Sequence, residues 1–212
     1  MKWGTFLEHF GNCAVIEPAM VYAGEPNPAA LQTQLSRWVK AGRLIKLARG
    51  KYALAAPYRK IELPLEHVAN RMVYPSYVSM ESALACYDLI PEAVAVVTSV
   101  TTARPRVVEN QLGTFRYRHI QQRLFWGYEA VSVQDQNCVI ASPEKAILDL
   151  LYFRVGTTTA GEIQEMRFQN LDRLDEDQLL TFARRTGVKK LIAGTKRFLE
   201  QRKVLLEEYD LL

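Results

Sequence analysis

The spacing of apolar residues predicts three helices in the first 42 positions. Residues 2–10 place aromatic and aliphatic side chains at helical spacing, and Gly11 ends the run. A second short helix fits residues 14–23. A third is expected from residue 28 to about 41, with Asn27 suited to its N-cap, Pro28 to its first turn and Gly42 to a C-terminal stop. We therefore predict a helical unit at the start of the chain.

The third predicted helix has two unlike faces. Its apolar face would pack on the first two helices and carries Leu31, Leu35, Trp38 and Val39. Its opposite face is small, polar or basic and lacks acidic residues; it carries Ala29, Thr33, Ser36, Arg37 and Lys40, with Gln32 at its flank. Such a face suits entry into a DNA major groove, because short side chains allow close approach, amides and hydroxyls bond base edges and cations bond phosphates.

Two β-prone segments follow this helix. Residues 43–48 and 51–55 read as a hairpin, with Arg49 and Gly50 at the turn. Lys46, Arg49 and Lys51 would lie near the tip, where they could contact a neighbouring DNA backbone. Three helices followed by a hairpin predict a winged helix-turn-helix DNA-binding domain over residues 1–58.

The remainder, residues 59–212, is predicted to be a larger α+β domain with a small mixed or antiparallel sheet framed by helices. Prolines punctuate residues 57–77, which read as a linker followed by a short helix at 65–72. Ser79 should cap a helix that runs to about Tyr87. The expected strands are 93–102, 104–110, 114–120, 124–133 and 137–141. The expected later helices are 143–154, 160–168, 175–185 and 189–206.

Charge is divided unevenly between the two parts. The chain has a formal charge of +4, but residues 1–60 hold nine Lys and Arg against three Asp and Glu, and the rest of the chain is net acidic. A basic excess confined to one end favours a polyanion-binding module joined to something else. The plainer alternative, a solvated helix and hairpin, is outweighed by the element order, the acid-free helix face and the basic hairpin tip.

A second group of basic residues lies on successive predicted segments of the larger domain: Arg104, Arg106, Arg116, Arg118 and Arg123, with His119 among them. Three interpretations stay open. The residues could form an ordinary solvated sheet face with scattered ion pairs, a second contact to the DNA backbone, or a docking surface for an acidic protein partner.

The catalytic and cofactor-binding motifs that we considered do not indicate an enzyme. Ser142-Pro-Glu-Lys145 matches the S-x-x-K pattern of some acyl-transfer enzymes, but a serine N-cap followed by proline before an apolar-periodic helix explains the same letters. Phosphate-loop, dinucleotide and H-E-x-x-H motifs are not found. The three cysteines and three histidines are scattered, which predicts buried free thiols and no metal site. We expect no cofactor.

The sequence also shows neither a signal-peptide pattern nor a membrane-span pattern. The amphipathic start MKWGTFLEHFGN lacks the apolar run of a signal peptide, and no window approaches the ~20 apolar residues of a membrane span. A cytoplasmic protein that does not enter the membrane is expected.

The segments MESALACYDLIPEAVAVVTSVTTARPR, LGTFRYRHI and ASPEKAILDLLY resemble the C-terminal domain of AbiEi-family antitoxins. The predicted N-terminal winged helix fits the regulator half of that family, so the likeness covers nearly the whole chain. It implies the antitoxin of a bicistronic abortive-infection toxin–antitoxin system of phage defence. Such antitoxins antagonise a nucleotidyltransferase-like toxin through the C-terminal domain, and repress their own promoter by binding its inverted repeats.

The sequence therefore favours a DNA-binding transcriptional repressor and antitoxin, with DNA contacts from the third helix and the hairpin. It leaves open whether a toxin partner exists; the alternative is a solitary regulator. A pure protein-interaction module, in which the winged helix is only a scaffold, is a rival of another class. An enzyme acting on nucleotides would need a carboxylate or phosphate-loop constellation that the sequence does not contain.

Overall fold

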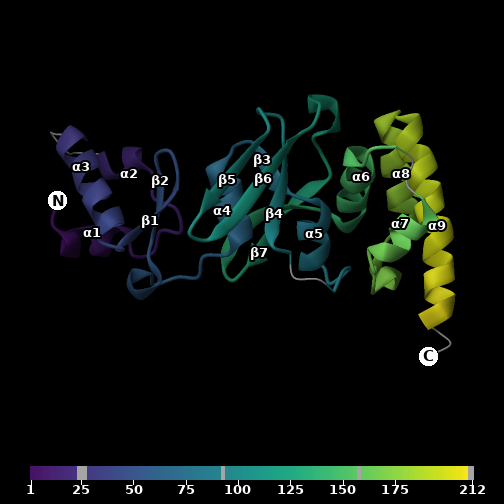
Figure 1. The fold of residues 1–212 in the computed structure, drawn as a ribbon, viewed down its shortest axis with the longest axis horizontal. Coiled ribbons are helices and arrows are strands. Elements are labelled where there is room, and N and C mark those ends of the chain that lie inside the picture. Colours follow the sequence, from purple (N-terminus) through teal and green to yellow (C-terminus); the bar gives the residue numbers. More distant parts are fainter. Residues whose placement is uncertain (23–27, 92–93, 157–158, 210–212) are drawn as a thin grey trace.

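A computed structural model describes residues 1–22, 28–91, 94–156 and 159–209, with the side chains of Pro28 and residues 207–209 left out. The fold is mixed α+β, as predicted. Figure 1 shows an elongated arrangement in which an N-terminal unit stands at one end, a mixed sheet in the middle and a group of helices at the other end.

The N-terminal unit contains α1 (Trp3–Phe10), α2 (Pro18–Tyr22) and α3 (Pro28–Lys40), followed by an antiparallel hairpin of β1 (Leu44–Ala48) and β2 (Lys51–Leu54). Gly50 in the turn has φ +70°, a left-handed conformation that costs glycine little. The predicted third helix and hairpin are thus present at nearly their predicted bounds. The predicted cap at Asn27 lies outside the described residues.

The predicted helix over 14–23 is wrong in its first half. The backbone of Ile16 exchanges two hydrogen bonds with Tyr52, N–H to carbonyl at 2.7 and 2.9 Å, so this stretch borders β2 as an extended segment. Pro18 explains the late start of α2, because proline is tolerated in a first helical turn and not further in.

The hairpin is buried on both of its faces. Leu44, Tyr52 and Leu54 join the aromatic core of α1 and α3, in which Phe6 and Trp38 lie 4.7 Å apart by ring centroids. The alternate residues of the hairpin, Ile45, Leu47 and Ala53, join the core of the rest of the chain. The amide Nδ2 of Asn110 also donates to the carbonyl of Leu47 at 3.0 Å. The N-terminal unit is therefore seated on the larger part, which we call the body (residues 59–209).

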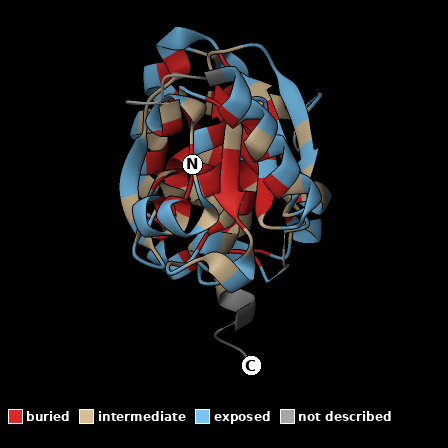
Figure 2. Ribbon diagram, turned by 90° about the vertical axis from the view of Figure 1, so that its left-hand side faces the viewer, coloured by how far each residue is buried: buried red, intermediate tan, exposed pale blue. Residues whose placement is uncertain are grey.

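The body is built on a mixed sheet, which has strand order β5-β6-β4-β3-β8-β7 in the described residues. The strands are β3 (Ser76–Val78), β4 (Val96–Thr101), β5 (Arg106–Asn110), β6 (Gly113–His119), β7 (Tyr128–Val133) and β8 (Gln136–Ala141). Figure 2, which looks from the N-terminal end, shows buried strands in the middle and exposed residues around them.

Strand β3 was not predicted. It has three residues, all buried, so it offers no alternation for a pattern to reveal, yet it lies between β4 and β8 at the centre of the sheet. The predicted strand 124–133 is also shorter than expected. A 3-10 turn (Gln122–Leu124) occupies its start, and Gly127 at φ +77° bends the chain before β7.

Helices cover both faces of this sheet (Figure 1). Helix α4 (Leu65–Met72) lies on the side of the hairpin, whereas α5 (Met80–Cys86) and α6 (Pro143–Phe153) lie on the other side. Beyond α6 come α7 (Ala160–Glu165), α8 (Glu176–Thr186) and α9 (Lys189–Tyr209). Three short 3-10 turns, Ala56–Tyr58, Gln122–Leu124 and Leu171–Arg173, connect elements of the described chain.

Two helix starts differ in how they are capped. Ser142 accepts a hydrogen bond from the backbone N–H of Lys145 at 3.2 Å, which confirms it as the N-cap of α6. Ser79 precedes α5, as expected, but makes no side-chain cap bond. Its hydroxyl donates instead to Asp149 on α6 at 2.8 Å.

Candidate nucleic-acid interface

The apolar and polar faces predicted for α3 are buried and exposed, respectively, in the structure. Leu31, Leu35 and Trp38 are buried and Val39 is half-buried. The predicted contact residues are all exposed: Gln32, Thr33, Ser36, Arg37 and Lys40. Since residues 26–61 contain no Asp or Glu, this face and the hairpin tip present cations without a carboxylate of their own segment.

The polar side chains on this face differ in freedom. The hydroxyl of Thr33 donates to the carbonyl of Ala29 at 3.1 Å, and that of Ser36 to the carbonyl of Gln32 at 3.0 Å. Each hydroxyl oxygen keeps acceptor capacity toward solvent, because a hydroxyl has one hydrogen and two lone pairs. These residues could therefore accept bonds from base edges without breaking their helical bonds.

Gln32 is more constrained than the sequence indicated. Its Oε1 accepts from the hydroxyl of Tyr22 at 2.6 Å, and its Nε2 donates to the hydroxyl of Tyr52 at 3.3 Å. The amide thus ties α3 to α2 and β2 and has one Nε2 hydrogen left over. Besides the base contact predicted for it, Gln32 therefore also helps to orient α3.

The hairpin cations are also unequal. Lys46 and Arg49 are exposed. Lys51 is not a free cation: its Nζ lies 3.0 Å from Oε1 of Glu17, and the lysine side chain is 24% exposed. The same Oε1 receives Nη2 of Arg71, from α4 of the body, at 3.3 Å. No local sequence pattern indicates this three-residue cluster, since its members are up to 54 residues apart.

The residues of the second basic group do not all lie on one surface. Arg106, Arg116 and Arg118 line one shallow depression of about 700 Å³, together with His119 and Phe153. Arg123 lies elsewhere: its Nη1 donates to the carbonyl of Thr186 at the end of α8, at 2.8 Å. Arg104 is exposed between β4 and β5.

Arg118 is the most ordered cation of this depression. Its guanidinium carbon lies 4.4 Å from the ring centroid of Phe153, and its Nη2 donates to the carbonyl of that residue at 3.4 Å. Burial, and then the neighbouring charge of Arg116, lower its pKa. Because a bound anion would relieve this repulsion, the depression is suited to an acidic ligand.

The body also contains a buried charge cluster that the sequence analysis missed. Asp149 accepts hydrogen bonds from the hydroxyls of Tyr77 at 2.9 Å and Ser79 at 2.8 Å, and forms an ion pair with Lys145 one turn earlier on α6. Burial raises the pKa of Asp149 and lowers that of Lys145, while their mutual attraction opposes both shifts. The i,i+4 spacing of Lys145 and Asp149 in a mainly apolar helix was the available signal.

The serine and lysine of the S-x-x-K pattern make separate contacts in the structure. The Lys145 ammonium pairs with Asp149, and the Ser142 hydroxyl donates to Oε2 of Glu144 at 2.9 Å. The Lys145 ammonium also lies 5.2 Å from the ring centroid of Trp126 and 5.5 Å from that of Tyr77. With the lysine and serine engaged separately, this geometry is that of a capped helix with an internal ion pair.

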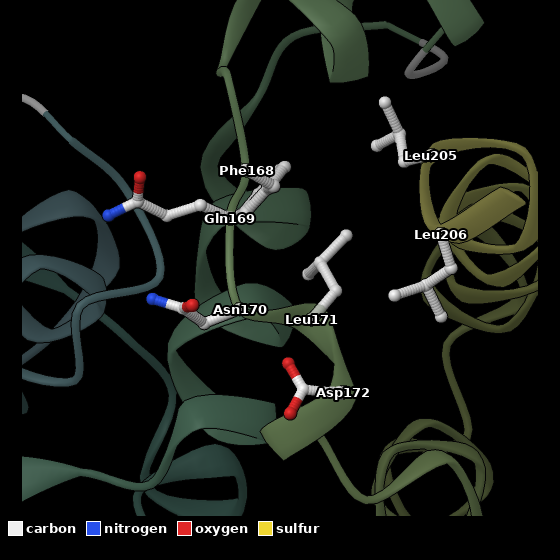
Figure 3. Close-up of a pocket in the computed structure, with 7 residues that line it drawn as sticks. All are labelled: Phe168, Gln169, Asn170, Leu171, Asp172, Leu205 and Leu206. Carbon is white, nitrogen blue, oxygen red and sulfur yellow. The ribbon is translucent and has the colours of Figure 1, made fainter. Parts of the chain in front are cut away.

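Other sites for chemistry are sparse in the described part of the chain, where no group of three or more His, Cys, Asp or Glu is arranged to hold a metal ion. A pocket of about 320 Å³ lies between the stretch 168–172 and the end of α9. In Figure 3, Leu171, Leu205 and Leu206 point toward one another across it, while Gln169 and Asn170 point away. This lining is mixed: Phe168 and the three leucines are apolar, Gln169 and Asn170 are polar, and Asp172 is charged.

The cysteines are free thiols, as predicted, but they are not all buried. Cys138 is buried, Cys13 is intermediate and Cys86 is exposed. The expectation of buried thiols is therefore wrong for Cys86, which lies in the last turn of the short helix α5.

No protein-family model matches this chain, and no curated protein sequence matches it. The likeness to AbiEi antitoxins therefore rests on the residue patterns alone. Among the described residues, no helix has the length and apolar character needed to cross a membrane.

Proposed function

We propose that this chain is a DNA-binding transcriptional repressor whose N-terminal unit acts as a winged helix-turn-helix. The observation that carries the proposal is the exposed face of α3, where two hydroxyls, an amide and two cations stand together with no acidic residue on the helix. Helix α3 would enter the major groove and read base edges through Thr33 and Ser36. Arg37, Lys40, Lys46 and Arg49 would bond backbone phosphates.

The resemblance to AbiEi proteins extends this proposal to an antitoxin. On that basis the DNA target is the protein's own promoter with its inverted repeats, and the body antagonises a nucleotidyltransferase-like toxin. The basic depression of Arg106, Arg116 and Arg118 is a candidate toxin-facing surface, since its cations would attract an acidic partner. No catalytic role is proposed for this chain.

The test is duplex binding by the full chain. Fluorescence anisotropy with a labelled duplex from upstream of its own gene should show tighter binding than a random duplex of equal length. Since phosphate contacts release counterions, affinity should fall steeply with salt, with a slope of about −0.9 for each phosphate contact. Equal, weak and salt-insensitive binding to both duplexes would refute the proposal that the chain is a DNA-binding repressor.

The alternative is a protein-interaction module or a solitary regulator without a toxin. The N-terminal unit shares its core with the body through Ile45 and Leu47. The whole chain should therefore be used to distinguish a protein-interaction module from a DNA-binding repressor. A chain that is retained on heparin only as weakly as an Arg37→Ala/Lys40→Ala variant would favour the interaction module. Co-expression with the product of the neighbouring gene, scored by growth, tests the antitoxin.

A further inference from the structure

One carboxylate oxygen at the junction of hairpin and body receives two cations. Lys51 reaches Oε1 of Glu17 from β2 at 3.0 Å, and Arg71 reaches the same atom from α4 at 3.3 Å. The side chains of Lys51, Glu17 and Arg71 are 24%, 35% and 48% exposed. An ammonium and a guanidinium that converge on one accessible oxygen atom form an anion-binding site, here filled by the protein's own carboxylate.

We propose that Lys51 and Arg71 form a clamp for one backbone phosphate of DNA, and that Glu17 occupies the clamp until DNA displaces it. This inference rests on the proposed DNA binding and adds to it a contact from the body, Arg71, that the sequence did not indicate. A phosphodiester oxygen carries the same negative charge and accepting geometry as the carboxylate oxygen, and guanidinium groups bind both.

The site is placed for this exchange. Lys51 stands on β2 directly after the turn that carries Arg49, a cation proposed to contact DNA. Glu17 lies just before α2, beside the Ile16 backbone that pairs with Tyr52 of β2. Partly exposed ion pairs contribute little to stability, so opening this one costs little, and a phosphate that replaces the carboxylate also releases counterions from DNA.

Three variants of the full chain test the clamp with a random 20-base-pair duplex. Arg71→Met should weaken binding several-fold and reduce the salt slope by about 0.9, as expected for one lost phosphate contact. Lys51→Met should behave alike. Glu17→Gln should instead bind about three- to tenfold tighter at 0.1 M salt, because no carboxylate competes with phosphate.

Matched controls separate the clamp from general charge effects. Glu8→Gln removes an exposed carboxylate of the same unit, on α1, and should change affinity by about twofold or less, since Glu8 forms no ion pair with another described residue. Arg184→Met removes an exposed cation on α8 of the body and should leave affinity and salt slope unchanged. The triple variant Glu17→Gln/Lys51→Met/Arg71→Met should lose the gain of Glu17→Gln. Unchanged thermal melting temperatures would show that each variant folds.

The outcomes distinguish this proposal from the one on which it rests. If the wild type binds DNA and Arg37→Ala weakens binding but Arg71→Met does not, the clamp is overturned and the repressor stands. A gain in Glu17→Gln no larger than that in Glu8→Gln also overturns the clamp. If neither the wild type nor any variant binds DNA, both proposals fall.

Discussion

Chemically similar side chains of the N-terminal unit have different contacts in the structure. Arg37 and Arg49 are exposed cations, whereas Lys51 is already paired with Glu17. Likewise Thr33 is free to accept from a base edge, whereas the amide of Gln32 links three elements. Substitutions at these positions should therefore have separable effects.

Arg37→Ala should weaken binding to specific and random duplexes by the same factor and reduce the salt slope by about 1, because a phosphate contact carries no sequence information. Thr33→Ala should mainly reduce the preference for the specific duplex, by up to about 1–3 kcal/mol for a lost base contact. Anisotropy titrations of both variants on both duplexes measure the two effects. Equal losses on the two duplexes for both variants would refute this division.

Cys86 should be an unreactive thiol despite its exposure. Burial of the sulfur, and then the neighbouring Glu66, raise the pKa of Cys86 to about 12. At pH 8 the thiolate fraction is then lower than that of an unperturbed thiol by roughly three orders of magnitude, and alkylation should be correspondingly slow. Mass spectrometry of a Cys13→Ser/Cys138→Ser variant with iodoacetamide measures the rate. Glu66→Gln should speed it, and a rate equal to that of free cysteine would contradict the prediction.

At the scale of elements, α6 connects the sheet to the terminal helices. Its start is fixed by Ser142, whose oxygen accepts from the Lys145 backbone, and by Pro143 in the first turn. Its interior carries the ion pair of Lys145 with Asp149, and Tyr77 of β3 donates to the latter. The helix is thus held both by its own cap and by a polar bond to the sheet.

Loss of the cap should be measurable and modest. Ser142→Ala should lower the free energy of unfolding by about 1 kcal/mol, because one N–H of the first turn loses its acceptor. Urea unfolding followed by circular dichroism measures the change. Ser142→Thr, which keeps a hydroxyl, should recover most of it; equal losses in the two variants would point to packing in place of capping.

Loss of the buried carboxylate should cost more. Asp149→Asn leaves the Lys145 ammonium buried without a counter-charge and should lower the free energy of unfolding by about 3–5 kcal/mol. The control is Asp172→Asn, at an exposed carboxylate, which should change it by about 0.5 kcal/mol or less. Urea unfolding compares the two, and similar small effects would show that Asp149 is dispensable.

At the scale of the molecule, the N-terminal unit and the body share an apolar core. Ile45, Leu47 and Ala53 of the hairpin lie in the body's core, and Asn110 bonds to the hairpin edge. The orientation of α3 is thereby set by the body, which is also the part proposed to meet a toxin.

The shared core predicts coupled unfolding. Trp3 and Trp38 lie in the N-terminal unit and Trp126 in the body, so Trp126→Phe makes tryptophan fluorescence a probe of the unit alone. In this variant, urea transitions by fluorescence and by far-ultraviolet circular dichroism should coincide. An N-terminal transition at clearly lower urea would show that the two parts unfold separately.

Much of the fold could be predicted from the sequence because most elements have a repeating pattern. Helix α4 and the exposed face of α3 follow from apolar spacing, and α6 from its serine and proline. Strand β3 has no pattern of its own, because all three residues are buried and its bonds come from β4 and β8. The helix predicted over 14–23 begins only at Pro18, because the backbone of Ile16 bonds to Tyr52, far along the chain.

The sequence by itself determined the local periodicity, the order of helices and hairpin, and the acid-free basic run from residue 28 to 51, since each depends on neighbours within a few positions. Only the tertiary structure decided which distant charged and polar groups meet. Glu17 meets Lys51 and Arg71, and Asp149 meets Tyr77, across separations of 34 to 72 residues. Ion pairs and hydrogen bonds depend on distance in space. For residues far apart in the sequence, that distance is set by how the chain folds.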